Sequence, residues 1–277
     1  MSSNIPERGG GGDSRGVMSP ILEVNDVSIA FGGLQALSEV SFNVLPGELL
    51  GIIGPNGAGK TVVLNCINGI HPPDSGDILF KGRSIRGLAC HKIAALGIGR
   101  TFQHSELFQR MTVMENVILG RHIYLKTNIL TGGIFWGPGR REEVRAREKA
   151  EMIMDFLELT MYRKEKVGNL AYGIQKIVGL ARALAGEPRL ILVDELGTGL
   201  MRQEKEDVAR FLLRIHHESK TAIVWIEHDM QLITEICDRL ICLSFGRKIK
   251  EGTPEEVIAD PEVIESYLGK RSHTVPD

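Results

Sequence analysis

The segment GPNGAGKT, residues 54–61, constrains the fold of this chain more than any other stretch. It matches the pattern G-x-x-x-x-G-K-[ST], follows the apolar run LLGII and precedes a segment with helical spacing. A strand, such a loop and a helix form a phosphate-binding unit, because backbone N–H groups and the helix N-terminus surround an anion. The alternative, a glycine-rich turn without a ligand, leaves the lysine and the threonine unexplained. The sequence therefore predicts a nucleotide-binding α/β protein.

The residues of this loop have distinct expected tasks. The glycines let the backbone turn inward around phosphate oxygens. Lys60 is expected to reach the β- and γ-phosphates, and the Thr61 hydroxyl is expected to bind Mg²⁺. The predicted nucleotide-binding residues of the loop are Gly54, Pro55, Asn56, Gly57, Ala58, Gly59, Lys60, Thr61 and Val62.

Strand-like and helix-like segments alternate along the chain. Apolar runs at 189–195 (RLILVDE) and 221–229 (TAIVWIEHD) are typical of strands in a buried parallel sheet. Helical segments are expected at 61–70, 144–159, 176–185 and 203–218. This alternation predicts a parallel sheet with flanking helices. Residues 125–141 (LKTNILTGGIFWGPGRR) are glycine-rich and are expected to form an irregular insertion or exposed loop.

Polar side chains follow the two later strands. Asp194 and Glu195 come after LILV, and His228 comes after VWIE. Ligands of parallel sheets bind at the carboxyl ends of strands, where these residues are expected to meet. A carboxylate there can hold Mg²⁺, and an adjacent one can polarise an attacking water. The alternatives are two solvated acids and a structural histidine, and the phosphate loop upstream argues against both.

Charge and composition exclude several classes of protein. The chain has 277 residues and a formal net charge of −2, which shows no bias toward nucleic acid. No apolar run approaches the roughly 18 residues of a membrane helix, and residues 1–17 do not form a secretory signal. The four cysteines include no CxxC pair, so we expect a reduced cytosolic setting and no metal site made of cysteines.

The order of motifs resembles one family. The phosphate loop, RTFQ (100–103), LAYG (170–173), LILVDE and IEHD follow one another as in the ATP-binding subunits of ABC transporters. The resemblance covers about residues 21–269. Within that family, the chain is most similar to the subunits of branched-chain (hydrophobic) amino acid importers. LAYG in place of LSGG, the insertion, IEHDM, GRKIKEGTPEEV and PEVIESYLG carry this closer likeness.

The resemblance implies a fold and a domain organisation. We expect a P-loop NTPase-type, mostly parallel sheet with flanking helices, an N-terminal antiparallel β part and a helical subdomain. An ABC ATPase domain would span 20–269, with the helical subdomain at about 104–185. Residues 1–19 are expected to form a flexible glycine-rich tail, and residues 270–277 a short C-terminal tail.

The resemblance also assigns roles to single residues. Phe31 stands where an aromatic ring stacks on adenine, although it could instead be a core aromatic. Gln103 stands where a glutamine contacts Mg²⁺ and the attacking water. Asp194 matches the Mg²⁺-associated acid, Glu195 the general base and His228 the γ-phosphate switch. Thr61, Gln103 and Asp194 are therefore the implied metal ligands.

The signature loop of the family is spelled differently here. Leu170, Ala171, Tyr172 and Gly173 are implied to meet the γ-phosphate of ATP held by a second subunit. LAYG is usual in the amino acid importer group, but Ile174 replaces the usual glutamine. Gln175 lies one residue later, which rotates its side chain by about 100° on a helix.

A second departure follows the catalytic acids. Leu196 stands where proline is common, and Met201 stands where Asp or Asn is usual. That second position normally helps two subunits to communicate. The phosphate loop and acids are thus complete, whereas two elements that act across subunits differ.

These features imply a transport ATPase that uses ATP and Mg²⁺. Its implied partners are transmembrane permease subunits, contacted through residues 104–125, and a second ATP-binding subunit in a homo- or heterodimer. A periplasmic solute-binding protein would act indirectly, and the chain would sit peripherally on the cytoplasmic face of the membrane. The alternative is a weakly hydrolysing ATP-dependent clamp, paired with a more active ATPase. An ABC ATPase acting on nucleic acid or ribosomes is disfavoured by the charge and the single ATPase unit.

Overall fold

A six-stranded sheet forms the centre of the molecule in the computed structural model, which describes residues 19–101, 107–121 and 138–268. The strand order is β10-β9-β3-β8-β7-β6, and all neighbours are parallel except the β9–β10 pair. The strands are β3 (Leu49–Ile53), β6 (Ile98–Thr101), β7 (Leu190–Asp194), β8 (Ala222–Ile226), β9 (Arg239–Ser244) and β10 (Arg247–Gly252). β3, β7 and β8 are buried along their whole length, which explains their continuous apolar sequences.

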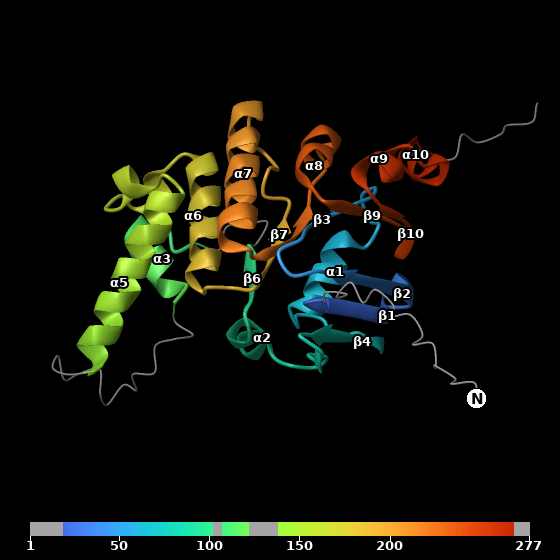
Figure 1. Ribbon diagram of the computed structural model, residues 1–277, viewed down its shortest axis with the longest axis horizontal. Helices are drawn as coiled ribbons and strands as arrows, with labels where there is room; N and C mark the ends of the chain where they lie inside the picture. The colour runs from blue at the N-terminus through green and yellow to red at the C-terminus, as the bar shows by residue number, and fades with distance from the viewer. Residues whose placement is uncertain (1–18, 102–106, 122–137, 269–277) are drawn as a thin grey trace, which may run out of the picture.

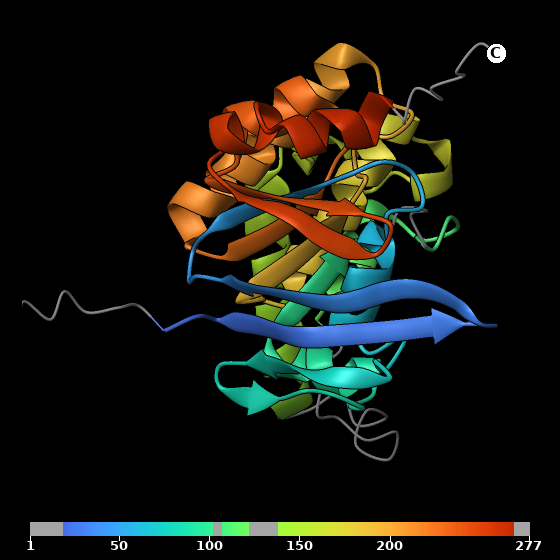
Figure 2. The same ribbon diagram turned by 90° about the vertical axis from the view of Figure 1, so that its right-hand side faces the viewer.

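A second, antiparallel sheet lies beside the first and precedes most of it in the chain (Figure 2). Its order is β2-β1-β4-β5, from β1 (Leu22–Phe31), β2 (Leu34–Val44), β4 (Ser75–Phe80) and β5 (Arg83–Ser84). Buried residues of β1, β2 and β4 join one core cluster with α1 (Lys60–Ile67) and one face of the central sheet. The fold class expected from the sequence is thereby confirmed.

Helices gather on the side of the molecule away from the antiparallel sheet (Figure 1). They are α3 (Val113–Leu119), α5 (Pro138–Phe156) and α6 (Tyr172–Ala185). Their apolar residues share a second core cluster with the other face of the central sheet. The expectation that 125–141 is irregular throughout was wrong at its end, because α5 already begins at Pro138, a residue favoured in the first turn of a helix. Residues 122–137 lie outside the described part of the chain.

The remaining helices complete the layers around the central sheet. They are α2 (Cys90–Leu96), α7 (Arg202–Arg214), α8 (Met230–Ile236), α9 (Pro254–Ile258) and α10 (Pro261–Leu268). A short π-helix at Ile215–Ser219 continues α7. No helix in the described ranges is both long and apolar enough to cross a membrane. The domain limits expected from the sequence stay a prediction.

Candidate nucleotide-binding and hydrolysis site

The phosphate loop joins β3 to α1 at the carboxyl edge of the central sheet. Gly54, Gly57 and Gly59 all have positive φ values, of 144°, 79° and 98°. Gly59 is also packed tightly, since a Cβ atom there would lie 2.7 Å from a methyl group of Leu37. The loop lines a cavity of about 330 Å³ together with Glu195, the start of β2 and Phe245, which lies between β9 and β10. Its backbone is thus bent around a space with room for phosphate groups.

Lys60 is the first residue of α1, and its side chain folds back over the loop. Its Nζ donates hydrogen bonds to the backbone oxygens of Gly54 at 2.7 Å and Pro55 at 3.1 Å. Burial lowers the pKa of Lys60, while the nearby carboxylates of Glu195 and Asp194 act in the opposite direction. A phosphate in the cavity would offer this ammonium charged oxygens in place of neutral carbonyls.

Thr61 and Asp194 are brought together although they are 133 residues apart. The Thr61 hydroxyl lies 3.4 Å from Asp194 Oδ1, and the Asp194 side chain is almost fully buried. Burial raises the pKa of Asp194, and the adjacent Arg100 guanidinium offsets part of this increase. A hydroxyl and a carboxylate beside the phosphate loop are hard oxygen ligands, which fit Mg²⁺. Gln103, the third expected ligand, lies outside the described residues.

Glu195 and His228 meet at the mouth of the same edge. His228 Nε2 lies 2.7 Å from Glu195 Oε1, and the Glu195 side chain lines the phosphate cavity. Glu195 also has a φ of 46°, a left-handed backbone conformation that residues other than glycine rarely adopt. Strain of this kind is concentrated at functional sites. The two residues therefore form a carboxylate–imidazole pair directed at the site where phosphate would sit.

The buried Glu227 holds the segment of His228 against the segment of Glu195. One of its carboxylate oxygens accepts a hydrogen bond from the N–H of Gly197 at 3.3 Å, and the other from the N–H of His228 at 2.9 Å. A glutamate that is only 2% exposed is unusual unless its hydrogen bonds are satisfied. Sequence reasoning missed this residue, because IEHD was interpreted through its histidine alone.

Two exposed aromatic residues, Phe31 and Phe245, differ in their relation to the phosphate cavity. Phe31 ends β1 and is 43% exposed, so the structure does not place it in the core. Its ring meets that of His71 edge-on, with 5.0 Å between centroids. Phe31 is not among the described residues that line the phosphate cavity, whereas the exposed Phe245 is. Adenine stacking on Phe31 stays a prediction.

The expected signature residues lead into α6, which lies apart from α1 in Figure 1, and none of them is among the described residues that line the phosphate cavity. Ala171 is the N-cap and makes no side-chain capping bond. Gln175 Nε2 donates to the backbone oxygen of Leu170 at 2.9 Å, so this side chain bends back onto the loop. Ile174 packs partly against the core cluster of the helical side. Gln175 is thus engaged locally and does not take the place of the missing glutamine.

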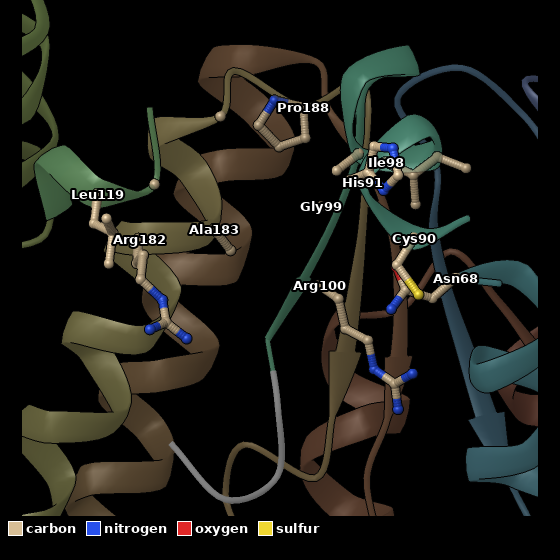
Figure 3. Close-up of a pocket in the computed structure, with 13 residues that line it drawn as sticks. Asn68, Cys90, His91, Ile98, Gly99, Arg100, Leu119, Arg182, Ala183 and Pro188 are labelled. Atoms are coloured by element: carbon tan, nitrogen blue, oxygen red, sulfur yellow. The ribbon is translucent and has the colours of Figure 1, made fainter. Parts of the chain in front are cut away.

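A separate groove of about 390 Å³ lies between α2 and β6 on one side and α3 and α6 on the other (Figure 3). Among the described residues, its lining contains the cationic side chains Arg100 and Arg182, the imidazole of His91, and no carboxylate. Cys90 stands in the same wall as His91, and Leu119 closes the opposite side next to Arg182. The groove therefore suits an occupant with apolar and acidic side chains.

Two contacts at the site join residues that are distant in sequence. Arg100, the first residue of RTFQ, forms an ion pair with Asp194, which lies 94 residues later in the sequence. The hydroxyl of Tyr267 in α10 accepts a hydrogen bond from the Gly54 N–H at 2.6 Å, across 213 residues. Burial raises the pKa of Tyr267 to about 12, so the phenol stays protonated. Local sequence patterns predict neither contact.

Family models and curated relatives point to the same kind of protein. Residues 37–197 match the family model for "ABC transporter", and residues 247–273 match that for "Branched-chain amino acid ATP-binding cassette transporter". The chain is 39% identical to the high-affinity branched-chain amino acid transport ATP-binding protein BraF of Pseudomonas aeruginosa, over 91% of this chain and 98% of that protein. It is 37% identical to LivG of Escherichia coli K12, which has the same description, over the same shares.

Solved structures agree with these relatives. A nucleotide-free ATP-binding cassette from an ABC transporter aligns with a TM-score of 0.79 and 31% identity, over 91% of this chain and 100% of that one. The ADP conformation of an ATP-binding cassette from an ABC transporter gives the same four values.

Proposed function

Because this chain belongs to the ABC transporter family, whose ATP-binding cassettes hydrolyse ATP, we propose that it energises the uptake of branched-chain amino acids through separate permease subunits. The C-terminal match at 247–273 is the observation that carries this proposal, because it lies outside the general cassette region. Related hydrophobic amino acids or similar small solutes would be selected by other chains of the transporter.

The geometry supports a division of labour at the ATP site. Lys60 and the backbone N–H groups of residues 56–62 would hold the phosphates, Gly54 and Pro55 would shape the start of the loop, and Phe31 would stack on the base. Thr61 and Asp194, with Gln103, would hold Mg²⁺, which would neutralise charge on the phosphate oxygens. Glu195 would accept a proton from the attacking water, and His228 would contact the γ-phosphate. The 2.7 Å contact between His228 and Glu195 keeps these two groups side by side.

A second ATP-binding subunit would complete each site. Leu170, Ala171, Tyr172 and Gly173 would face the γ-phosphate of ATP bound by that subunit, since they are remote from their own phosphate cavity. Gly173 is closely packed, because a Cβ there would collide with the Glu204 carboxylate. The exposed Met201, which offers no polar group at the usual Asp or Asn position, favours the weakly hydrolysing clamp as a second candidate.

The permease would dock in the groove lined by Arg182, His91, Cys90 and Leu119. Leu119 belongs to the segment 104–125 that was expected to receive the membrane subunit, and Phe108 in that segment is 53% exposed. A cytoplasmic permease segment with apolar and acidic side chains would complement the positive charge of the groove. With this docking surface the chain would lie on the cytoplasmic face of the membrane, and a periplasmic solute-binding protein would act only through the permease.

Uptake of radiolabelled leucine, isoleucine and valine tests the transport proposal. In the organism that carries this chain, deleting its coding sequence is expected to reduce uptake of these amino acids at least fivefold. The wild-type chain should restore uptake, and the Glu195→Gln variant should not. Unchanged uptake of all three amino acids in the deletion strain, despite loss of the protein, would refute branched-chain amino acid transport.

Labelling of Cys90 tests the docking groove. Cys90 is exposed, whereas Cys66, Cys237 and Cys242 are buried, and burial raises the pKa of Cys66 to about 12 and that of Cys242 to about 11. We therefore expect a bulky maleimide to modify one thiol of the native chain. The adduct should reduce permease-coupled transport at least fivefold and leave ATP binding by the isolated chain, measured without Mg²⁺, within twofold. The Cys90→Ala variant, treated identically, is the control, and coupling that survives full labelling would contradict the assignment.

A further inference from the structure

Arg100 lies between the groove and Asp194, the carboxylate that is expected to bind Mg²⁺. It follows Gly99 in β6, and its side chain is only 5% exposed. One guanidinium nitrogen donates to Asp194 Oδ2 at 2.9 Å, and the other donates to Asn65 Oδ1 of α1 at 2.7 Å. A planar fork with two fixed partners holds a carboxylate in one orientation, which a flexible ammonium cannot do.

The orientation of Asp194 matters because its two oxygens face different groups. Oδ2 is bound by Arg100, and Oδ1 is 3.4 Å from the Thr61 hydroxyl. Arg100 therefore leaves one oxygen directed toward the other expected metal ligand. Asn65 fixes the guanidinium from the helix that begins with Lys60 and Thr61, so both ligand-bearing elements are tied to the same side chain.

The same side chain forms part of the groove wall. Arg100 lines the groove with Cys90 and Asn68, and it extends from β6 toward their side of the groove, away from Arg182 (Figure 3). An occupant that presses on this wall, above all one with an acidic group, would compete for the guanidinium.

We propose that Arg100 is a positioning residue that links occupancy of the groove to the orientation of Asp194. Contact between the permease and the groove would shift the guanidinium, and the shift would change how well Asp194 and Thr61 bind Mg²⁺ with the nucleotide. The physical basis is that one rigid guanidinium group belongs both to the groove wall and to the surroundings of Asp194. This inference rests on the docking surface of the proposed function, although its test does not need the permease.

The test measures Mg²⁺-dependent nucleotide binding by the isolated full-length chain. A fluorescent, non-hydrolysable ATP analogue is titrated with Mg²⁺, before and after Cys90 is modified with N-phenylmaleimide to occupy the groove. In the wild type, the adduct is expected to raise the half-saturating Mg²⁺ concentration at least threefold. In Arg100→Gln, that concentration should already be about tenfold higher, because a hydrogen bond to a charged group is lost, and the adduct should add nothing. Binding of the analogue without Mg²⁺ should change less than twofold in either case.

Matched variants separate this link from simpler effects. Arg83→Gln removes an exposed charge of β5, outside the groove, and should keep both the wild-type Mg²⁺ dependence and the adduct effect. Arg100→Lys, which keeps the charge without the fork, should behave like Arg100→Gln, and it serves if the glutamine variant does not fold. Wild-type Mg²⁺ dependence in the Arg100 variants, or an equal adduct effect with and without Arg100, would overturn the proposal. If the link holds and labelled chains still couple to the permease, the docking surface fails and the inference about Arg100 stands.

Discussion

The Glu195→Gln variant is expected to hydrolyse ATP about 10²- to 10⁴-fold more slowly than the wild type, which is the usual contribution of a general base. Glutamine keeps the size of the side chain but cannot accept a proton from water at neutral pH. ATP affinity should stay within about threefold, because the phosphate loop and Lys60 are unchanged. Steady-state phosphate release and nucleotide binding, measured on the same preparation, check both expectations.

Glu206→Gln is the control for this variant. Glu206 is an exposed carboxylate of α7 whose ion pair with Arg202 lies on the surface. Its neutralisation should leave the hydrolysis rate within twofold. Hydrolysis by Glu195→Gln at more than a tenth of the wild-type rate would show that another group acts as the base.

The same variant distinguishes the two candidate functions. Slow hydrolysis should trap ATP-bound dimers. Size-exclusion chromatography with light scattering detects them by their molar mass. If Glu195→Gln dimerises with ATP as well as Glu195→Gln/Ile174→Gln, LAYG works without the glutamine and the chain acts as a full ATPase subunit. If only the double variant dimerises, the signature loop is weakened and the clamp with a more active partner is favoured.

Replacing Gly54 with alanine is expected to destabilise the fold by about 3 kcal/mol or more. Gly54 has a φ of 144°, a region that residues with a side chain avoid, and a Cβ there would overlap the backbone oxygen of Leu243 in β9. Because that oxygen belongs to a strand of the central sheet, it cannot move away like a flexible side chain. Thermal unfolding should show a melting temperature lower by roughly 5–10 °C for a chain of this size.

Gly179→Ala is the matched control for Gly54→Ala. Gly179 lies inside α6, and a Cβ there would meet nothing within 4 Å. Alanine favours the helix over glycine by up to about 1 kcal/mol, so this variant should melt at the same or a higher temperature. Equal melting temperatures for Gly54→Ala and the wild type would mean that the loop tolerates a side chain at Gly54.

The parts of the site that follow from local sequence could be predicted. Residues 54–61 carry strand end, loop and helix start in one segment, and Asp194 and His228 end runs that are apolar enough to be buried strands. The edge where these strands meet follows from the rule for parallel sheets. The contact between His228 and Glu195 agrees with that expectation.

Contacts between distant segments could not be predicted in the same way. Arg100 and Asp194 face each other because β6 and β7 pair in parallel, with Arg100 in register with Leu192, and single-sequence patterns do not give register. The beginning of α5 at Pro138 was hidden by the glycines and aromatic residues before it. In each case, tertiary packing decides what local composition leaves open.

The hydrogen bond between Gly54 and Tyr267 couples the stability of the phosphate loop to the stability of α10, near the other end of the chain. Whatever steadies the phosphate loop also steadies α10, and by reciprocity a disturbance of the last helix weakens the grip on nucleotide. Shortening the chain into α10 would remove this hydrogen bond and is expected to weaken nucleotide binding. A purification handle joined close to Tyr267 would alter the affinity that it was meant to help measure.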